Sequence, residues 1–249
     1  MADLILKVSG LTKSFGAVRA SDGLSFNVER GSIHALIGPN GAGKSTAIAQ
    51  ISGETSQDSG RIEFDGHDIS RMQSYCRARL GLQRSYQITS LFPNLTAEDN
   101  VALAVQAGAG HSFRFWSAAR RDPALREPAR AALRRVGLAD REGLPVTQLA
   151  HGEQRQLELA MAMATKPSML LLDEPMAGMG HQEGVAMMEA IRSLKGDVSI
   201  LLVEHDMDIV FSLADKISVL VKGSVLMTGS ADEVRNDRDV RAAYLGEEN

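Results

Sequence analysis

The sequence has very little cysteine and no long hydrophobic run. Cys76 is the single cysteine among 249 residues, so no disulfide can form within the chain and an oxidising compartment is not indicated. The longest apolar runs, Met169–Leu172 and Ile200–Val203, are far shorter than the roughly 20 residues that span a bilayer, and residues 1–10 lack the pattern of a secretion signal. We therefore expect a cytosolic protein, with any membrane in its function crossed by another polypeptide.

The sequence also lacks an excess of charge of either sign. Its 27 Lys and Arg residues and 31 Asp and Glu residues give a net charge of −4, with a pI near 5.9. Such a chain provides no positive field that would hold DNA or RNA against salt, so nucleic acid is not expected as the main partner. With 44% hydrophobic and 23% charged residues, the composition is that of an ordinary folded protein.

Two kinds of strand are predicted from the hydrophobic pattern. Short segments that alternate, or that carry β-branched and aromatic residues between turn formers, indicate a small antiparallel sheet at Leu4–Val8, Ser25–Val28 and Arg61–Phe64. Nearly continuous apolar runs indicate parallel strands covered by helices on both faces, at Ser32–Ile37, Met169–Leu172 and Ser199–Val203. A hairpin is predicted at 217–227. Together these segments predict an α/β fold.

The middle of the chain has helical spacing and almost no strand signal. We expect one domain over 1–249, with a catalytic core lobe at 1–86 and 166–230. A helical subdomain at 87–165 is inserted between the core strands, and a partly helical C-terminal tail follows at 231–249.

One helix of the middle region is marked by Asp122 as its N-cap, Pro123 in its first turn and Gly137 at its end. Pro128 either kinks this helix or delays its start. A row of arginines lies on another face, and a solvated surface is favoured over a phosphate or lipid-headgroup site. The row comprises Arg126, Arg130 and Arg134. The aromatic segment Ser112–Trp116 is either locally packed or a contact surface, and the sequence leaves both open.

The segment from Gly38 to Thr46 has the pattern of a phosphate-binding loop. It follows an apolar strand and opens a helix that Gly53 ends. Its glycines let N–H groups converge on phosphate oxygens, Lys44 reaches the outer phosphates, and the Ser45 hydroxyl can bind magnesium. We therefore predict a site for a nucleoside triphosphate, ATP with Mg²⁺. The predicted loop is Gly38, Pro39, Asn40, Gly41, Ala42, Gly43, Lys44, Ser45 and Thr46.

Two adjacent carboxylates, Asp173 and Glu174, end the apolar run that begins at Met169. Ligands of open α/β sheets bind at the carboxyl ends of the strands, so these side chains are expected beside the triphosphate. Asp173 fits the magnesium side of a phosphoryl-transfer site, while Glu174 can orient and deprotonate the attacking water.

A further segment starts a helix that bears an apolar face; it comprises Leu149, Ala150, His151, Gly152 and Glu153. The order of motifs along nearly the whole chain resembles the ATP-binding subunits of ABC transporters. These motifs are the phosphate loop, a glutamine at Gln87, this Leu-x-x-Gly-Glu signature, the acidic strand and His205. The resemblance implies a P-loop NTPase (RecA-like) core with an antiparallel β subdomain and an inserted α-helical subdomain.

The resemblance also implies roles for single residues. The signature of one subunit closes over the phosphate loop of a second subunit, either a copy of this chain or a paralogue, so that two ATP molecules are sandwiched. Gln87 resembles the glutamine that senses magnesium and water and links the site to the membrane subunit. His205 resembles the switch histidine at the terminal phosphate, and Phe15 the aromatic that stacks on adenine. Packing of Phe15 in the core is the alternative.

Some residues depart from the family's pattern. Ala150 and His151 replace the usual Ser and first Gly of the signature, and Gly180 replaces an Asp that follows the acidic strand. The signature, the long helical insertion and the ending Asp239–Gly246 resemble the branch that serves high-affinity uptake of branched-chain amino acids. Relatives for urea, short amides or other organic acids share this pattern.

The resemblance implies partners and a location. The partners are transmembrane permease subunits and, indirectly, a periplasmic solute-binding protein, with the chain peripheral on the cytoplasmic face of the inner membrane. A coupling helix of the permease is expected to face Leu91–Thr96. The alternatives are a soluble ABC-type ATPase that acts on nucleic acid or ribosomes, and a small-molecule kinase. The acidic single cassette speaks against the first, and the signature against the second.

Overall fold

The computed structural model describes residues 3–85, 91–108 and 122–245. These residues form two compact units. The first unit is made of Met1–Gln83, Ser168–Glu174 and Lys195–Asn249, and the second of Arg84–Pro167 and Pro175–Leu194. From the sequence we expected 175–194 in the core lobe. In the structure this stretch belongs to the second unit, because the helix it forms packs against a helix of the middle region.

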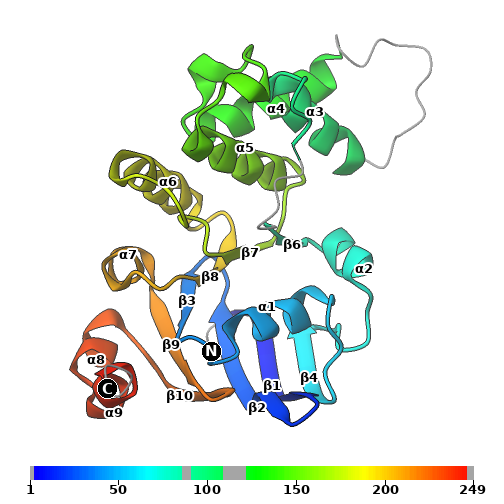
Figure 1. The fold of residues 1–249 in the computed structure, drawn as a ribbon. Helices are drawn as coiled ribbons and strands as arrows, with labels where there is room; N and C mark the ends of the chain where they lie inside the picture. Colours follow the sequence, from blue (N-terminus) through cyan, green and yellow to red (C-terminus); the bar gives the residue numbers. More distant parts are fainter. Residues whose placement is uncertain (1–2, 86–90, 109–121, 246–249) are drawn as a thin grey trace. The chain divides into compact units, whose positions relative to one another are not determined.

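The small sheet of the first unit has the strand order β2-β1-β4-β5. Its strands β2, β1 and β4 are labelled in Figure 1. Its strands are β1 (Leu4–Phe15), β2 (Val18–Glu29), β4 (Ser59–Phe64) and β5 (His67–Asp68). All neighbours pair antiparallel, which confirms the prediction, although β1 and β2 are longer than the predicted segments. The alternation is visible in β2, where Leu24, Phe26 and Val28 are buried while Ser25 and Asn27 are exposed.

The large sheet of the first unit has the order β10-β9-β3-β8-β7-β6. Its strands are β3 (Ile33–Ile37), β6 (Leu82–Arg84), β7 (Met169–Asp173), β8 (Ser199–Val203), β9 (Lys216–Val221) and β10 (Ser224–Gly229). The three predicted parallel strands are confirmed as β3, β8 and β7, which are adjacent and wholly buried. Because parallel neighbours end at the same edge, the loops after these strands open on one side of the sheet.

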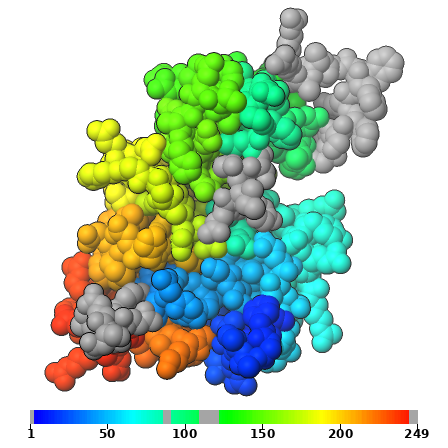
Figure 2. Space-filling view, viewed as in Figure 1, coloured from blue at the N-terminus to red at the C-terminus, as the bar shows by residue number. Residues whose placement is uncertain are grey.

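The hairpin and the tail are confirmed as well. β9 and β10 pair antiparallel across Lys222 and Gly223, whose φ values of 47° and 83° are both positive, as a two-residue hairpin turn of type I′ requires. The tail forms α8 (Ala231–Asn236) and α9 (Arg238–Leu245), which pack on β10. In Figure 2 the C-terminal helices, in red, and the N-terminal strands, in dark blue, both reach the surface of this unit.

The remaining helices of the first unit flank its sheets. They are α1 (Lys44–Ser52), α2 (Ser74–Arg79) and α7 (Met207–Leu213). Helix α1 contacts both β7 of the large sheet and β2 of the small one, and its apolar face joins the core shared by the two sheets. It ends at Gly53, which has a φ of 82°, as predicted.

The second unit is helical, as predicted for the middle region. Its helices are α3 (Ala97–Gly108), α4 (Pro123–Arg135), α5 (His151–Ala164) and α6 (His181–Leu194), with 3₁₀ turns at Ala139–Arg141 and Val146–Gln148. The Asp122 carboxylate caps α4 by accepting from the N–H of Ala124 at 2.9 Å. Pro128 lies inside this helix and does not delay its start. In the described part of the chain, no helix is long and apolar enough to cross a membrane.

The arginine row on α4 is solvated only in part, whereas the sequence indicated a solvated surface for all three residues. Arg126 is only 12% exposed in its side chain and lies 2.7 Å from Asp99, while Arg130 lies 3.0 Å from Glu98. Both acids belong to the first turn of α3, 27 or more residues away in the chain, so the pairing was not visible as a local pattern. Arg134 is exposed, as expected. The segment Ser112–Trp116 lies outside the described residues.

Candidate functional site

The predicted phosphate-binding loop, Gly38 to Thr46, is held between two other parts of the first unit. A Cβ added to Gly38 would lie 2.2 Å from the carbonyl oxygen of Leu220, and one added to Gly43 would lie 2.2 Å from the carbonyl oxygen of Ala20. The φ values of Gly38 and Gly43, 154° and 102°, also lie in the region that favours glycine. Close approach and backbone conformation therefore both require glycine at these two positions.

The turn of the β9–β10 hairpin supports the loop directly. The N–H of Gly223 donates to the carbonyl of Ala42 at 2.9 Å, and the N–H of Asp22 donates to the carbonyl of Gly223 at 2.8 Å. This turn was predicted only as a hairpin. Its contact with the loop joins residues about 180 positions apart, for which the sequence carries no local signal.

Lys44 is the first residue of α1, and its ammonium lies within the loop. The side chain is buried, and Nζ donates to the carbonyls of Gly38 at 2.6 Å and of Pro39 at 3.0 Å. The positive end of the α1 dipole adds to this charge. Ser45 is exposed at the start of the helix, and Asn40 and Gly41 are exposed at the crest of the loop. A helix N-terminus, a glycine-rich loop and a fixed cation together are the features that suit phosphate groups.

The acidic strand end lies at the same sheet edge as this loop, because β3, β8 and β7 are parallel neighbours. Asp173 is buried at the end of β7. The N–H of Glu174 donates to the carbonyl of Val203 at 2.9 Å, and its φ of 49° lies in the left-handed region, which costs a non-glycine residue about 1–3 kcal/mol. Strained backbone of this kind is concentrated at functional sites.

The end of β8 brings His205 to this edge. Its side chain is 67% exposed, and its Nδ1 lies 3.8 Å from a carboxylate oxygen of the neighbouring Glu204, which is buried. The loop after β3, the acids after β7 and the histidine after β8 therefore belong to one edge of one sheet. Gln87, the remaining residue predicted for this site, lies outside the described residues.

Phe15 lies at the end of β1, paired with Val18 at the start of β2. The Phe15 residue is 53% exposed and Val18 is 66% exposed. The alternative that Phe15 packs in the core is therefore wrong. The ammonium of Lys13 lies 5.5 Å from the centre of the Phe15 ring. This contact was not predicted from the sequence.

The predicted signature forms the start of α5 in the second unit, with Ala150 as its N-cap residue. The carboxylate of Glu153 accepts from the N–H of Ala150 at 2.9 Å and from Nε of Arg141 at 2.8 Å. Desolvation raises the pKa of Glu153, but these hydrogen bonds outweigh it and leave the pKa below its usual value. Glu153 thus stays ionised at the positive end of the helix.

A second carboxylate at this helix end was not anticipated. Glu183 accepts from the N–H of Gly152 and from the N–H of Gly180, each at 3.1 Å. A Cβ at Gly152 would lie 2.7 Å from the Cβ of Glu183, so the two segments pack closely. Glu183 therefore connects the signature to the residue that replaces the family's usual Asp. Its position 31 residues from Gly152 left no signal in the local pattern.

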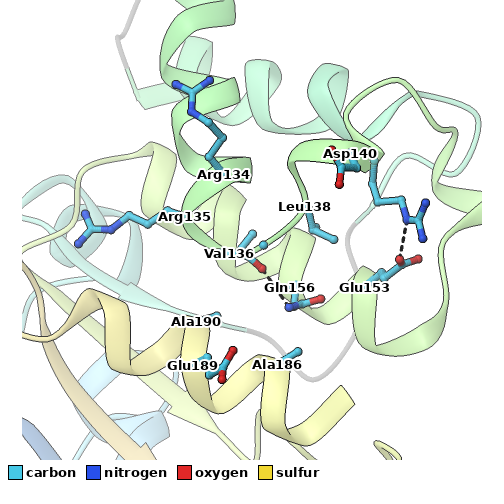
Figure 3. Close-up of a pocket in the computed structure, with 12 residues that line it drawn as sticks. Arg134, Arg135, Val136, Leu138, Asp140, Glu153, Gln156, Ala186, Glu189 and Ala190 are labelled. Atoms are coloured by element: carbon cyan, nitrogen blue, oxygen red, sulfur yellow. Dashed lines mark hydrogen bonds and ion pairs between the residues drawn. The ribbon is translucent and has the colours of Figure 1, made fainter. Parts of the chain in front are cut away.

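The second unit also contains a cavity of about 520 Å³ (Figure 3). It lies between the end of α4, the start of α5 and the middle of α6. On its walls the side-chain amide of Gln156 donates to the carbonyl of Val136 at 2.9 Å, and Arg141 is paired with Glu153.

The family is settled by comparison with known proteins. A model of the ABC transporter family matches residues 21–177. The chain belongs to the ABC transporter family. A second model, for branched-chain amino acid ATP-binding cassette transporters, matches residues 224–249. The resemblance found in the sequence is confirmed, and this ABC cassette is an ATP-binding subunit and an ATPase.

Two curated relatives match this ABC cassette over nearly its whole length. The high-affinity branched-chain amino acid transport ATP-binding protein BraF of Pseudomonas aeruginosa is 36% identical over 256 residues, covering 99% of this chain and 100% of the relative. The protein LivG of Escherichia coli, described in the same words, is 34% identical over 258 residues, with coverage of 99% and 100%.

Solved structures match as well. A nucleotide-free ATP-binding cassette from an ABC transporter aligns with a TM-score of 0.83 at 26% identity, covering 97% of this chain and 98% of the other. The ADP conformation of the cassette MJ1267 aligns with a TM-score of 0.84 at 26% identity, covering 98% and 99%. The predicted fold class, a P-loop NTPase core with an antiparallel β subdomain and a helical subdomain, is confirmed.

Proposed function

We propose that this ABC ATPase powers an importer for branched-chain amino acids or related small polar solutes. The observation that carries the proposal is the match of residues 224–249 to the branched-chain amino acid model. Within the described part of that segment, α8 and α9 pack on β10, so it is an integral part of the first unit. The full-length similarity to BraF and LivG supports the same branch.

The residues of the sheet edge suit the hydrolysis of ATP. Lys44 and the N–H groups of the loop bind the outer phosphates and stabilise the charge that develops on them. Glu174 orients a water molecule and takes its proton as the oxygen attacks the terminal phosphorus, and ADP leaves. His205 contacts the terminal phosphate. In this proposal Gln87 senses magnesium and water and links the site to the membrane subunit.

Magnesium fits the donors that the chain offers. A hydroxyl oxygen from Ser45 and a carboxylate from Asp173 are hard ligands, and α1, which carries Ser45, packs on β7, which ends at Asp173. The described residues contain no cluster of three His, Cys, Asp or Glu side chains that could hold a metal ion alone. Ser45, Asp173 and Gln87 would therefore hold Mg²⁺ together with phosphate oxygens and water, and the ion would neutralise charge on the phosphates.

We further propose that the complete site needs a second subunit, a copy of this chain or a paralogue. The signature from Leu149 to Glu153 would act in trans, with the start of α5 directed at the terminal phosphate bound by the partner. This arrangement uses the same anion-binding chemistry as the phosphate loop. The departures at Ala150, His151 and Gly180 belong to this half of the site.

A surface of the second unit supports a permease contact. Phe92 is 52% exposed, while the buried side chain of Asn100 accepts from its N–H at 2.8 Å and donates to its carbonyl at 3.2 Å. A cavity of about 140 Å³ is lined by apolar residues that include Leu95 and Leu103, and by Asp99, Gln106 and Arg126. The N–H of Leu95 donates to the carbonyl of Phe92 at 3.1 Å. An exposed aromatic on a fixed backbone, followed in the chain by a residue that lines a partly apolar cavity, suits a short amphipathic helix of a permease. We place the chain on the cytoplasmic face of the membrane, with a periplasmic solute-binding protein as an indirect partner.

The test uses membranes that contain the permease and the solute-binding protein encoded beside this chain. With the unmodified chain we expect co-purification with the permease and ATP-dependent uptake of labelled leucine. Glu174→Gln should keep ATP binding but lose hydrolysis and uptake by about 10²–10⁴-fold, because the base is gone. Glu189→Gln, an exposed change on α6, serves as the control. Unchanged hydrolysis by Glu174→Gln would refute the assignment of the base, and uptake of another solute alone would refute the substrate class.

A further inference from the structure

Phe15, which resembles the aromatic that stacks on the adenine of ATP, lies at the end of a hairpin and is 53% exposed. It is the last residue of β1, and its partner Val18 is more exposed still. An exposed aromatic side chain at a strand end is free to change rotamer, and ordering such a side chain costs binding free energy. A binding site gains affinity if the ring is already held in place.

Lys13 holds a position from which it can fix this ring. Lys13 and Phe15 lie two residues apart on β1. The ammonium nitrogen lies 5.5 Å from the ring centre, within the range of a cation–π contact. The Lys13 side chain is only 15% exposed, which is unusually low for a lysine in a strand of the small sheet.

Asp58 fixes Lys13 and the backbone around it. One carboxylate oxygen lies 2.9 Å from the Lys13 ammonium, and the other accepts from the N–H of Ser14 at 2.8 Å. The N–H of Asp58 donates to the carbonyl of Thr12 at 2.8 Å. The hydrogen bond from Lys13 is the main cause that lowers the pKa of Asp58, and the hydrogen bond from the N–H of Ser14 adds to it. Lys13 and Asp58 are therefore both ionised at neutral pH. Three successive residues directly before Phe15 are thus bound to one aspartate.

We propose that Lys13 and Asp58 are positioning residues for the nucleotide base. Lys13 covers one face of the Phe15 ring, Asp58 holds Lys13 there, and the other face of the ring stays available to a purine. The inference rests on the proposed nucleotide site. It adds that the strength of base stacking depends on an ion pair behind the ring.

The experiment compares the affinity of the full-length chain for MgATP with its affinity for inorganic tripolyphosphate, by titration calorimetry. Lys13→Met keeps most of the aliphatic stem but removes the charge. It should raise the Kd for ATP about 3–10-fold, the factor expected for ordering one side chain, and leave the Kd for tripolyphosphate unchanged. Asp58→Asn should act in the same direction, whereas Lys13→Arg should bind ATP like the unmodified chain. Lys7→Met, at an exposed lysine of β1, is the matched control.

A double-variant cycle decides whether Lys13 acts through the ring. In a Phe15→Leu background, Lys13→Met should cause no further loss of ATP affinity. An equal loss for ATP and tripolyphosphate would show that Lys13 binds phosphate directly, and additive losses with Phe15→Leu would show that it acts without the ring. Either result overturns the inference. If the unmodified chain bound tripolyphosphate but not ATP, the proposed adenine site itself would fail.

Discussion

Lowering the pH from 7.5 to 5.0 should destabilise the first unit through His34. This histidine lies on β3, the strand that leads into the phosphate loop, and it is 1% exposed. Its Nε2 lies 2.9 Å from the hydroxyl of Ser218, and its ring lies 5.7 Å from that of Phe26. Burial, with a smaller effect of Lys216, lowers the pKa of His34 from 6.5 to about 4.

The sign follows from the protons bound in each state. Between pH 6.5 and about 4, the unfolded chain protonates this histidine and the folded chain does not, so stability rises with pH and acidification favours unfolding. The gap between the two pKa values corresponds to a loss of about 3 kcal/mol in the free energy of unfolding once the pH lies below both. About 2 kcal/mol of this is already lost at pH 5.0.

The assay is urea unfolding of the unmodified chain and of His34→Leu at pH 7.5 and pH 5.0. Ser218 keeps a partner in the variant, because its hydroxyl also lies 2.7 Å from that of Thr228. Other titrating groups cancel when the two proteins are compared at each pH. The difference in the free energy of unfolding between the unmodified chain and His34→Leu should shift by about 2 kcal/mol against the unmodified chain on acidification. His67→Gln, at an exposed histidine of β5, should show no such change. A difference between the unmodified chain and His34→Leu that is independent of pH would refute the reasoning.

Three further changes test local features of the fold by urea unfolding. Gly43→Ala should lose about 1–3 kcal/mol and weaken ATP binding, because its Cβ would lie 2.2 Å from a carbonyl oxygen of β2; normal ATP affinity would contradict the geometry of the loop. Arg77→Met should lose about 1–3 kcal/mol, since the buried guanidinium donates at 2.8 Å to two carbonyls in the last turn of α1; an unchanged midpoint would contradict this. Gly152→Ala should lower the free energy of unfolding by about 1–3 kcal/mol, because its Cβ would lie 2.7 Å from that of Glu183. Gly184→Ala on α6 has open space around it and should not destabilise the protein. Equal effects of these two changes would refute the packing argument.

The parts of the site that could be predicted are those specified by a short stretch of chain. A strand, a glycine-rich turn and a helix that opens with Lys44 occupy consecutive residues, so the loop was recognisable without knowing its neighbours. The same holds for the acids that end β7 and for the hairpin turn at Lys222 and Gly223. The order of these motifs predicted the family, and the comparisons with known proteins confirmed it.

Contacts between distant segments could not be predicted, because each depends on which elements become neighbours. At Arg126 a salt bridge with Asp99 took the place of the solvent exposure that the spacing on α4 predicted. Likewise, the hydrogen bond from the Lys13 ammonium to the Asp58 carboxylate joins residues that are 45 positions apart in the sequence. Nothing in either local sequence shows that the partner will arrive at hydrogen-bonding distance.

By itself the sequence determined the α/β class and the family and predicted the phosphate loop, because backbone preference, hydrophobic period and glycine placement act over a few residues. Tertiary structure decided the order β3-β8-β7, which brings the loop, Glu174 and His205 to one sheet edge. It also decided that residues 175–194 belong to the helical unit and that Glu183 meets the start of α5. These outcomes depend on burying the apolar faces of whole elements against one another, and that is settled only when the chain packs.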